Sequence, residues 1–194
     1  MYSRTLASVH VSEEGRTHPP VVFTRADLHR LFDLLNDDLA EHGAEGELYV
    51  VGGAVMCLAL EARASTRDVD AFFKPATLVR EAAARVAARA RVPDTWLNDA
   101  VKGFLGPRGE FDRYLELPHL RIFVARPAYL LAMKCAAMRL GVEFHDLDDV
   151  RYLLRYLNVT EVDEAMRLVT LYFDESRLLP KTRLVLEELL PRSP

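Results

Sequence analysis

Two aspartates separated by one residue are the strongest chemical feature of the sequence. Asp68 and Asp70 open a β-prone segment, and alternation along a strand turns both carboxylates to one side while Val69 points into the core. Carboxylates held this close repel one another unless a cation lies between them, and hard oxygen ligands suit Mg²⁺ or Mn²⁺. The other reading is a solvated strand entry in which Asp68 caps a turn. Aspartate is disfavoured in strands and apolar residues follow directly, so we favour the metal site.

A pair of glycines precedes these acids. Gly52 and Gly53 stand between the β-prone residues 48–51 and the apolar run 54–60. Glycines allow a sharp turn and a close approach of an anion to the backbone amides, and the start of a helix favours phosphate. Taken alone, a strand–turn–helix with two glycines is more often only a tight connection.

A lysine on an apolar helix is the third feature. Lys134 has Leu130 and Met138 one turn to either side, so its ammonium group projects from an apolar face. It is either a triphosphate ligand or a lysine that extends from the edge of the core into water. Asp146 and Asp149 open the next helix, where capping explains them. Alternatively, Asp149 pairs with Lys134 or assists the metal site.

The elements that must position these residues follow from the hydrophobic pattern. We expect a helix from the capping sequence at Thr24–Asp27 to Leu39, and a polar arm over residues 1–20. Further helices are expected at 54–60, 75–91, 128–140, 146–157, 161–173 and 181–190, and strands at 48–51, 69–73 and 120–125; residues 91–116 have no clear assignment. The order predicts an α+β protein whose short mixed sheet is flanked by helices. Residues 1–125 form the α/β part and 126–194 a helical part packed on it, as two units or one domain.

Composition limits the class of protein. The chain has 194 residues, half of them apolar, and a net charge of -4, which is typical of a globular domain and excludes a strongly basic nucleic-acid coat. Cys57 and Cys135 are far apart, so neither a disulfide framework nor a zinc site is indicated. The longest uncharged apolar run, 54–60, is much shorter than the ~20 residues that cross a bilayer. We expect a cytoplasmic protein with no membrane contact.

Four blocks in this order resemble a known family. Residues 51–54, 65–70, 132–139 and 146–149 are similar to the nucleotidyltransferase-fold group of AbiEii and MenT toxins, over about residues 48–157. The resemblance implies a nucleotidyltransferase-like fold and a Mg²⁺ site at Asp68 and Asp70. It also implies catalytic roles for the two aspartates, Lys134, and Asp146 or Asp149, and nucleotide binding by Gly52, Gly53, Thr66, Arg67 and Lys134. Two departures stand out: many members have Gly-Ser at the glycine pair, and the 120–125 strand carries no third carboxylate.

The activity that the resemblance implies is transfer of nucleotides from an NTP to the 3′ acceptor end of tRNA. The protein would then be the toxin of a toxin–antitoxin system, with an antitoxin protein as its partner. Arg63, Arg85 and Arg89 are candidates for a nucleic-acid patch, although each alone reads as an ordinary solvated charge. The alternatives are transfer to a protein or small-molecule hydroxyl, and a catalytically silent binding module.

Overall fold

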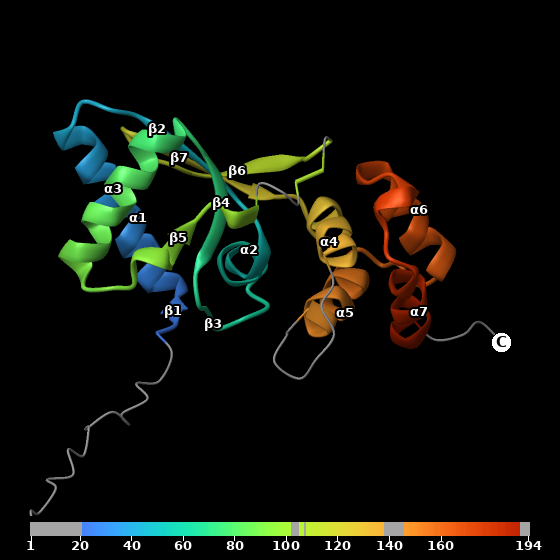
Figure 1. Cartoon of the computed structure of the whole chain (residues 1–194). Helices are drawn as coiled ribbons and strands as arrows, with labels where there is room; N and C mark the ends of the chain where they lie inside the picture. The colour runs from blue at the N-terminus through green and yellow to red at the C-terminus, as the bar shows by residue number, and fades with distance from the viewer. Residues whose placement is uncertain (1–20, 102–104, 107, 138–145, 191–194) are drawn as a thin grey trace, which may run out of the picture.

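The structure is a computed structural model that describes residues 21–101, 105–106, 108–137 and 146–190, without the side chains of Asp146 and Arg177. It is an α+β protein with a mixed five-stranded sheet, as the pattern of elements predicted (Figure 1). The polar arm expected over residues 1–20 lies outside the described residues. No helix in the described part of the chain has both the length and the apolar character needed to cross a membrane.

The strand order of the sheet is β5-β4-β2-β7-β6. In that order the strands are Leu97–Asn98, Val69–Lys74, Gly46–Val50, Leu120–Ala125 and Phe111–Glu116. The central strand β2 runs antiparallel to β4 and parallel to β7, β5 is parallel to β4, and β6 is antiparallel to β7. A separate two-stranded ladder joins β1, Phe23–Thr24, to β3, Ser65–Thr66.

Two long helices cover one face of the sheet. Helix α1, Arg25–Glu41, begins with the predicted capping box of Thr24 and Asp27, and it packs beside α3, Ala76–Ala90 (Figure 1). Strand residues on this face, such as Leu48 and Ala71, are fully buried. The other face carries three half-buried aromatic rings stacked across β4, β2 and β7, those of Phe72, Tyr49 and Phe123. Asp70 lies on this second face, two residues from Phe72.

The remaining helices lie at the end of the sheet where β2 stops. Helix α2, Gly52–Leu58, follows β2 directly and packs against β4. The C-terminal helices, orange to red in Figure 1, are α4, α5, α6 and α7: Pro127–Ala136, Asp146–Tyr156, Val162–Tyr172 and Pro180–Leu189. Their apolar faces share one hydrophobic core with the α/β part, and the ring of Phe111 on β6 meets that of Tyr129 on α4.

The described residues of 91–116, for which the sequence gives no clear assignment, include the strands β5 and β6 and a 3-10 helix, Asp94–Trp96. Strand β5 has only two residues, which is too short to leave a period in the sequence. Strand β6 has no fully buried residue and is interrupted by a register shift between Arg113 and Leu115. Its inner face therefore lacks the regular alternation of a half-buried strand.

Candidate functional site

The acid pair stands at the start of β4, beside the end of β2. Val69 is fully buried, whereas Asp68 and Asp70 on either side of it are half-buried, as the alternation predicted. Burial, followed by the negative charge of Asp70, raises the pKa of Asp68, while Arg67 acts in the opposite direction. The Asp68 carboxylate therefore lies where its negative charge is only partly balanced. Paired carboxylate oxygens of this kind suit a divalent cation.

Gly52 and Gly53, which we call the glycine turn, are the first two residues of α2, whereas the sequence predicted a helix that begins at residue 54. The glycine turn packs directly on β4. Gly52 has a φ of +66°, which favours glycine, and a Cβ atom there would lie 2.9 Å from Oδ2 of Asp70. A Cβ atom on Gly53 would lie 3.0 Å from Oγ1 of Thr66 and 3.3 Å from Nη1 of Arg63. A serine at position 53 would crowd both side chains, and the hydroxyl of Thr66 already lies at this spot. Packing against Thr66 and Arg63 therefore explains why position 53 is a glycine.

A buried ion-pair cluster joins α4 and α5 to the connection between α2 and β3. Lys134 Nζ lies 2.8 Å from Oδ2 of Asp149, and Arg63 Nη2 and Nε lie 2.6 and 2.8 Å from Oδ1 of the same carboxylate. Asp149 has a side chain only 3% exposed, while the two cations are partly exposed. One carboxylate shared by two cations leaves a net positive charge, which attracts anions.

These contacts form one continuous site. A Cβ atom on Gly52 would meet the Asp70 carboxylate and one on Gly53 would meet Arg63, and Arg63 shares Asp149 with Lys134. The structure thus brings together the glycine pair, the acid strand, the helix lysine and one of the two distal acids, although they come from distant segments of the chain. Helix α5 begins at Asp146, whose side chain lies outside the described residues. Arg67 is exposed next to Asp68.

The neighbour of the acid pair is Asn98, which the sequence interpretation missed. Asn98 on β5 pairs with Asp70 in the sheet, and its Nδ2 lies 3.5 Å from Oδ2 of Asp68. The strand 120–125, which carries no carboxylate, is β7, and β2 separates it from β4. Asp99 pairs with Arg80 on α3 at 2.6 Å.

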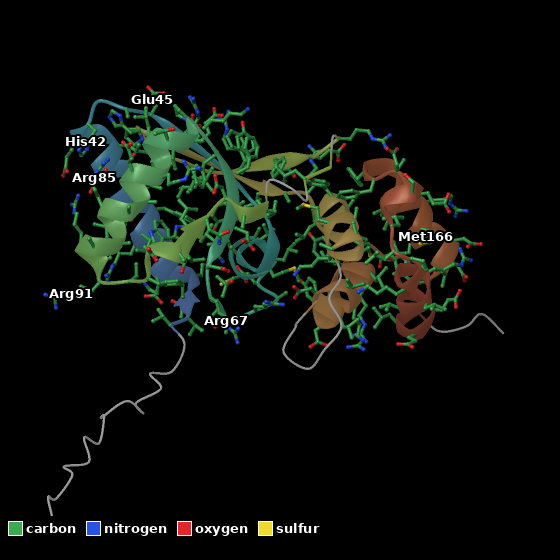
Figure 2. All side chains as sticks on the ribbon, viewed as in Figure 1. His42, Glu45, Arg67, Arg85, Arg91 and Met166 are labelled. Carbon is green, nitrogen blue, oxygen red and sulfur yellow. The ribbon has the colours of Figure 1, made fainter. Side chains whose placement is uncertain are left out.

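The three arginines proposed as a nucleic-acid patch have different surroundings. Arg63 belongs to the site itself. Arg85 donates hydrogen bonds to the buried carboxylate of Asp38, and Arg89 pairs with Asp38 and Glu41, so both tie α3 to α1. Figure 2 shows Arg85 beside these helices, on a different side of the molecule from Arg67. The structure does not bring Arg85 and Arg89 together with Arg63.

A second acidic group lies at the end of α1. Asp38, Glu41 and His42 each offer a ligand atom within 4.8 Å of the others. The Asp38 carboxylate already accepts hydrogen bonds from Arg85 at 2.7 and 3.0 Å. An arginine bound in this fork geometry neutralises the carboxylate, so the group is explained as an ion-pair cluster between α1 and α3.

The site has two charged parts with a glycine turn between them. The acid pair suits a divalent cation, while Arg63 and Lys134 suit phosphate groups. Side-chain atoms of Asp70, Thr66 and Arg63 lie at the Cβ positions of the two glycines, so the absence of side chains in the turn lets the two parts come close together. Comparison of the chain with protein-family models, with curated proteins and with solved structures gives no match.

Proposed function

We propose that the protein is a nucleotidyltransferase that uses an NTP as donor and a hydroxyl group as acceptor. The observation that carries the proposal is the position of the glycine turn: a Cβ atom on Gly52 would meet the metal-type acid Asp70, and one on Gly53 would meet the phosphate-type cation Arg63. A metal-bound triphosphate needs these two kinds of group within the length of one ligand.

Each residue of the site has a role in such a transfer. Asp68 and Asp70 would hold Mg²⁺, or Mn²⁺, which when bound neutralises charge on the triphosphate. Arg63 and Lys134 would neutralise the outer phosphates and stabilise the leaving group. Asp149 has both oxygens occupied by these cations, so its role is to orient them. The acceptor oxygen forms a bond to the α-phosphorus as the bond to the β-phosphate breaks, pyrophosphate leaves, and the acceptor proton passes to water.

The acceptor that we propose is the 3′ end of tRNA, and its support is the resemblance of the four sequence blocks to the AbiEii and MenT toxins. On the same basis we propose a toxin that acts in the cytoplasm and is neutralised by an antitoxin protein. Induced expression in a bacterial host should then stop growth. Replacing Asp70 with asparagine should restore growth without lowering the amount of protein.

The direct test is transfer of label from each α-³²P-labelled NTP to total tRNA in the presence of Mg²⁺. The Asp70→Asn variant is compared with Asp112→Asn, an exposed aspartate on β6 that pairs with Arg126. Label on tRNA from the wild type and from Asp112→Asn, but not from Asp70→Asn, would support the proposal. Label on tRNA from neither the wild type nor the control, with every NTP tried, would contradict it.

A second candidate, a catalytically silent binding module, is favoured by one observation. The residue nearest to the acid pair on β5 is an amide, Asn98, and an amide is a weaker ligand for a hard cation than a carboxylate. Under this reading, NTP and Mg²⁺ bind but no label is transferred to any acceptor. Calorimetric titration with a non-hydrolysable NTP analogue, run beside the transfer assay, separates the two candidates.

A further inference from the structure

A pocket of about 430 Å³ opens between α5 and the connection from α2 to β3. Its polar lining includes Arg63, Arg151 and Arg155, together with Asp148 and Asp149. We propose that this pocket binds a backbone phosphate of a single-stranded RNA end, and that it is the acceptor subsite of the enzyme. The identity of the strand as acceptor rests on the proposed function.

The charges around the pocket favour a phosphate. Asp149 is already shared by Arg63 and Lys134, so it does not neutralise the arginines of α5. Arg151 and Arg155 are four residues apart and share one face of the helix. Arg151 has an ion pair with the exposed Asp148, at 2.9 Å, and such a pair is weak. The two arginines of α5 therefore keep most of their positive charge available to a ligand.

The chemistry of the arginines narrows the ligand further. A guanidinium group offers a planar fork of donors that matches the oxygens of a phosphate. Arg151 and Arg155 offer two such groups at one concave site, and Arg63, whose fork binds Asp149, adds a third positive charge beside them. An anionic ligand such as a phosphodiester therefore fits the pocket better than a neutral hydroxyl compound does.

Aromatic side chains beside the arginines favour a single strand. Tyr152 lines the pocket and is fixed by a hydrogen bond from its hydroxyl to the carbonyl of Leu60. The ring of Tyr156, which is 53% exposed, lies nearly parallel to that of Tyr152, with the centroids 6.1 Å apart. An exposed ring next to a basic groove is the arrangement by which proteins bind unpaired bases. In an A-form duplex the bases are stacked on one another and do not reach such a ring.

The pocket and the donor site share a wall. Arg63 lines the pocket, and its Nη1 also lies 3.3 Å from the Cβ position of Gly53 in the glycine turn. A strand whose phosphate lies at Arg151 and Arg155 would thus have its terminal nucleotide close to the donor triphosphate. Because Arg63 belongs to both sites, an RNA end that binds in the pocket is held near the acid pair.

The experiment measures RNA binding without catalysis. A fluorescein-labelled hairpin with a single-stranded 3′ end is titrated with the protein, without NTP or Mg²⁺, and fluorescence anisotropy is recorded over a series of salt concentrations. The double variant Arg151→Gln/Arg155→Gln should bind more weakly, and the slope of log Kd against log salt should fall by about 1 for each phosphate that the variant no longer binds. Tyr156→Leu should raise Kd about tenfold and leave the slope unchanged, because it removes stacking but no charge.

The matched control is Arg113→Gln/Arg183→Gln, which removes the same charge from exposed arginines on β6 and α7. Arg113 pairs with Glu116 three residues away, as Arg151 does with Asp148. Arg63 is left unchanged because its removal would expose the buried Asp149 charge. Equal slopes for the α5 variant and the control would overturn the inference, even if transfer to tRNA is observed. A lower slope for the α5 variant alone would support it, even if no NTP labels tRNA, so the two proposals fail separately.

Discussion

The ammonium nitrogen of Lys134 lies 2.8 Å from Oδ2 of Asp149, a carboxylate that is almost fully buried between α4 and α5. The other oxygen of this carboxylate is bound by Arg63, so a single acid fixes two cations that come from different elements. A buried carboxylate is costly unless it is paired, and here both of its oxygens have a cationic partner. The ion pairs of Asp149 therefore have two effects: they hold α5 against α4, and they fix the positions of the positive charges in the site.

Replacing Asp149 with asparagine should destabilise the protein, because two partly buried cations then lose their counter-charge. We expect a loss of about 3 kcal/mol in the free energy of unfolding, measured by urea denaturation. The control is Asp148→Asn, which changes the adjacent but exposed acid and should stay within about 0.5 kcal/mol of the wild type. Equal effects of the two substitutions would show that the cluster does not stabilise the fold.

Asp68→Asn should stabilise the protein at neutral pH while it removes a metal ligand. The pKa of Asp68 is raised by burial and by Asp70, so ionising this group opposes folding at any pH above its usual value of 3.8. An asparagine does not ionise, so its burial carries no such free-energy cost. The thermal midpoint of the variant should exceed that of the wild type at pH 7, and the difference should shrink as the pH falls toward and below 3.8, where the aspartate becomes protonated in both states.

Added Mg²⁺ provides the second measurement on the same pair of proteins. If the acid pair holds the ion, Mg²⁺ should raise the thermal midpoint of the wild type and have little effect on Asp68→Asn. A midpoint for Asp68→Asn below that of the wild type at pH 7, without metal, would contradict the assignment of an unbalanced acid pair.

Some positions of the site could be predicted because they depend only on the spacing of neighbouring residues along one strand or one helix. The alternation around Val69 predicts that Asp68 and Asp70 face the same side, and the apolar turns around Lys134 predict its helix face. Both patterns extend over only a few residues. They depend on the number of residues per turn of a helix or per repeat of a strand, and not on how distant segments of the chain pack together.

The parts that the sequence did not predict depend on strand order and on long-range pairing. Asn98 lies next to the acid pair only because β5 joins the sheet beside β4, and a strand of two residues leaves no period to detect. Charge and nearness to the acid strand in the sequence group Arg63 with Arg85 and Arg89. The fold instead separates them, since buried acids on different helices, Asp149 and Asp38, select their partners.

Asn98→Asp tests whether this position completes the metal site. A third carboxylate beside Asp68 should tighten Mg²⁺ binding, with Kd falling by about tenfold, because the affinity of oxygen sites rises with ligand charge. Without metal the same variant should be less stable than the wild type, since a further negative charge joins an already unbalanced pair. Calorimetric titration and thermal unfolding, each with and without Mg²⁺, measure both effects. Asp99→Asn changes an acid that pairs with Arg80 and should leave the affinity for Mg²⁺ unchanged.

Gly52→Ala and Gly43→Ala form a matched pair that isolates the contact between the glycine turn and Asp70. Both glycines have a positive φ, +66° and +61°, so each substitution should cost about 1 kcal/mol of stability through backbone strain alone. They differ in what the new methyl group meets. It would meet nothing within 4 Å at position 43, and Oδ2 of Asp70 at 2.9 Å at position 52.

The Asp70 oxygen is the end of a side chain, so it can move aside at little cost in stability. We therefore expect similar losses of stability in the two variants, measured by urea denaturation, but a loss of Mg²⁺ binding and of nucleotide transfer only in Gly52→Ala. The displaced carboxylate can no longer share a cation with Asp68, whereas Gly43 lies outside the site and its variant keeps the acid pair intact. Unchanged Mg²⁺ binding in Gly52→Ala would mean that Asp70 is not a metal ligand, and the proposed donor site would have to be abandoned with it.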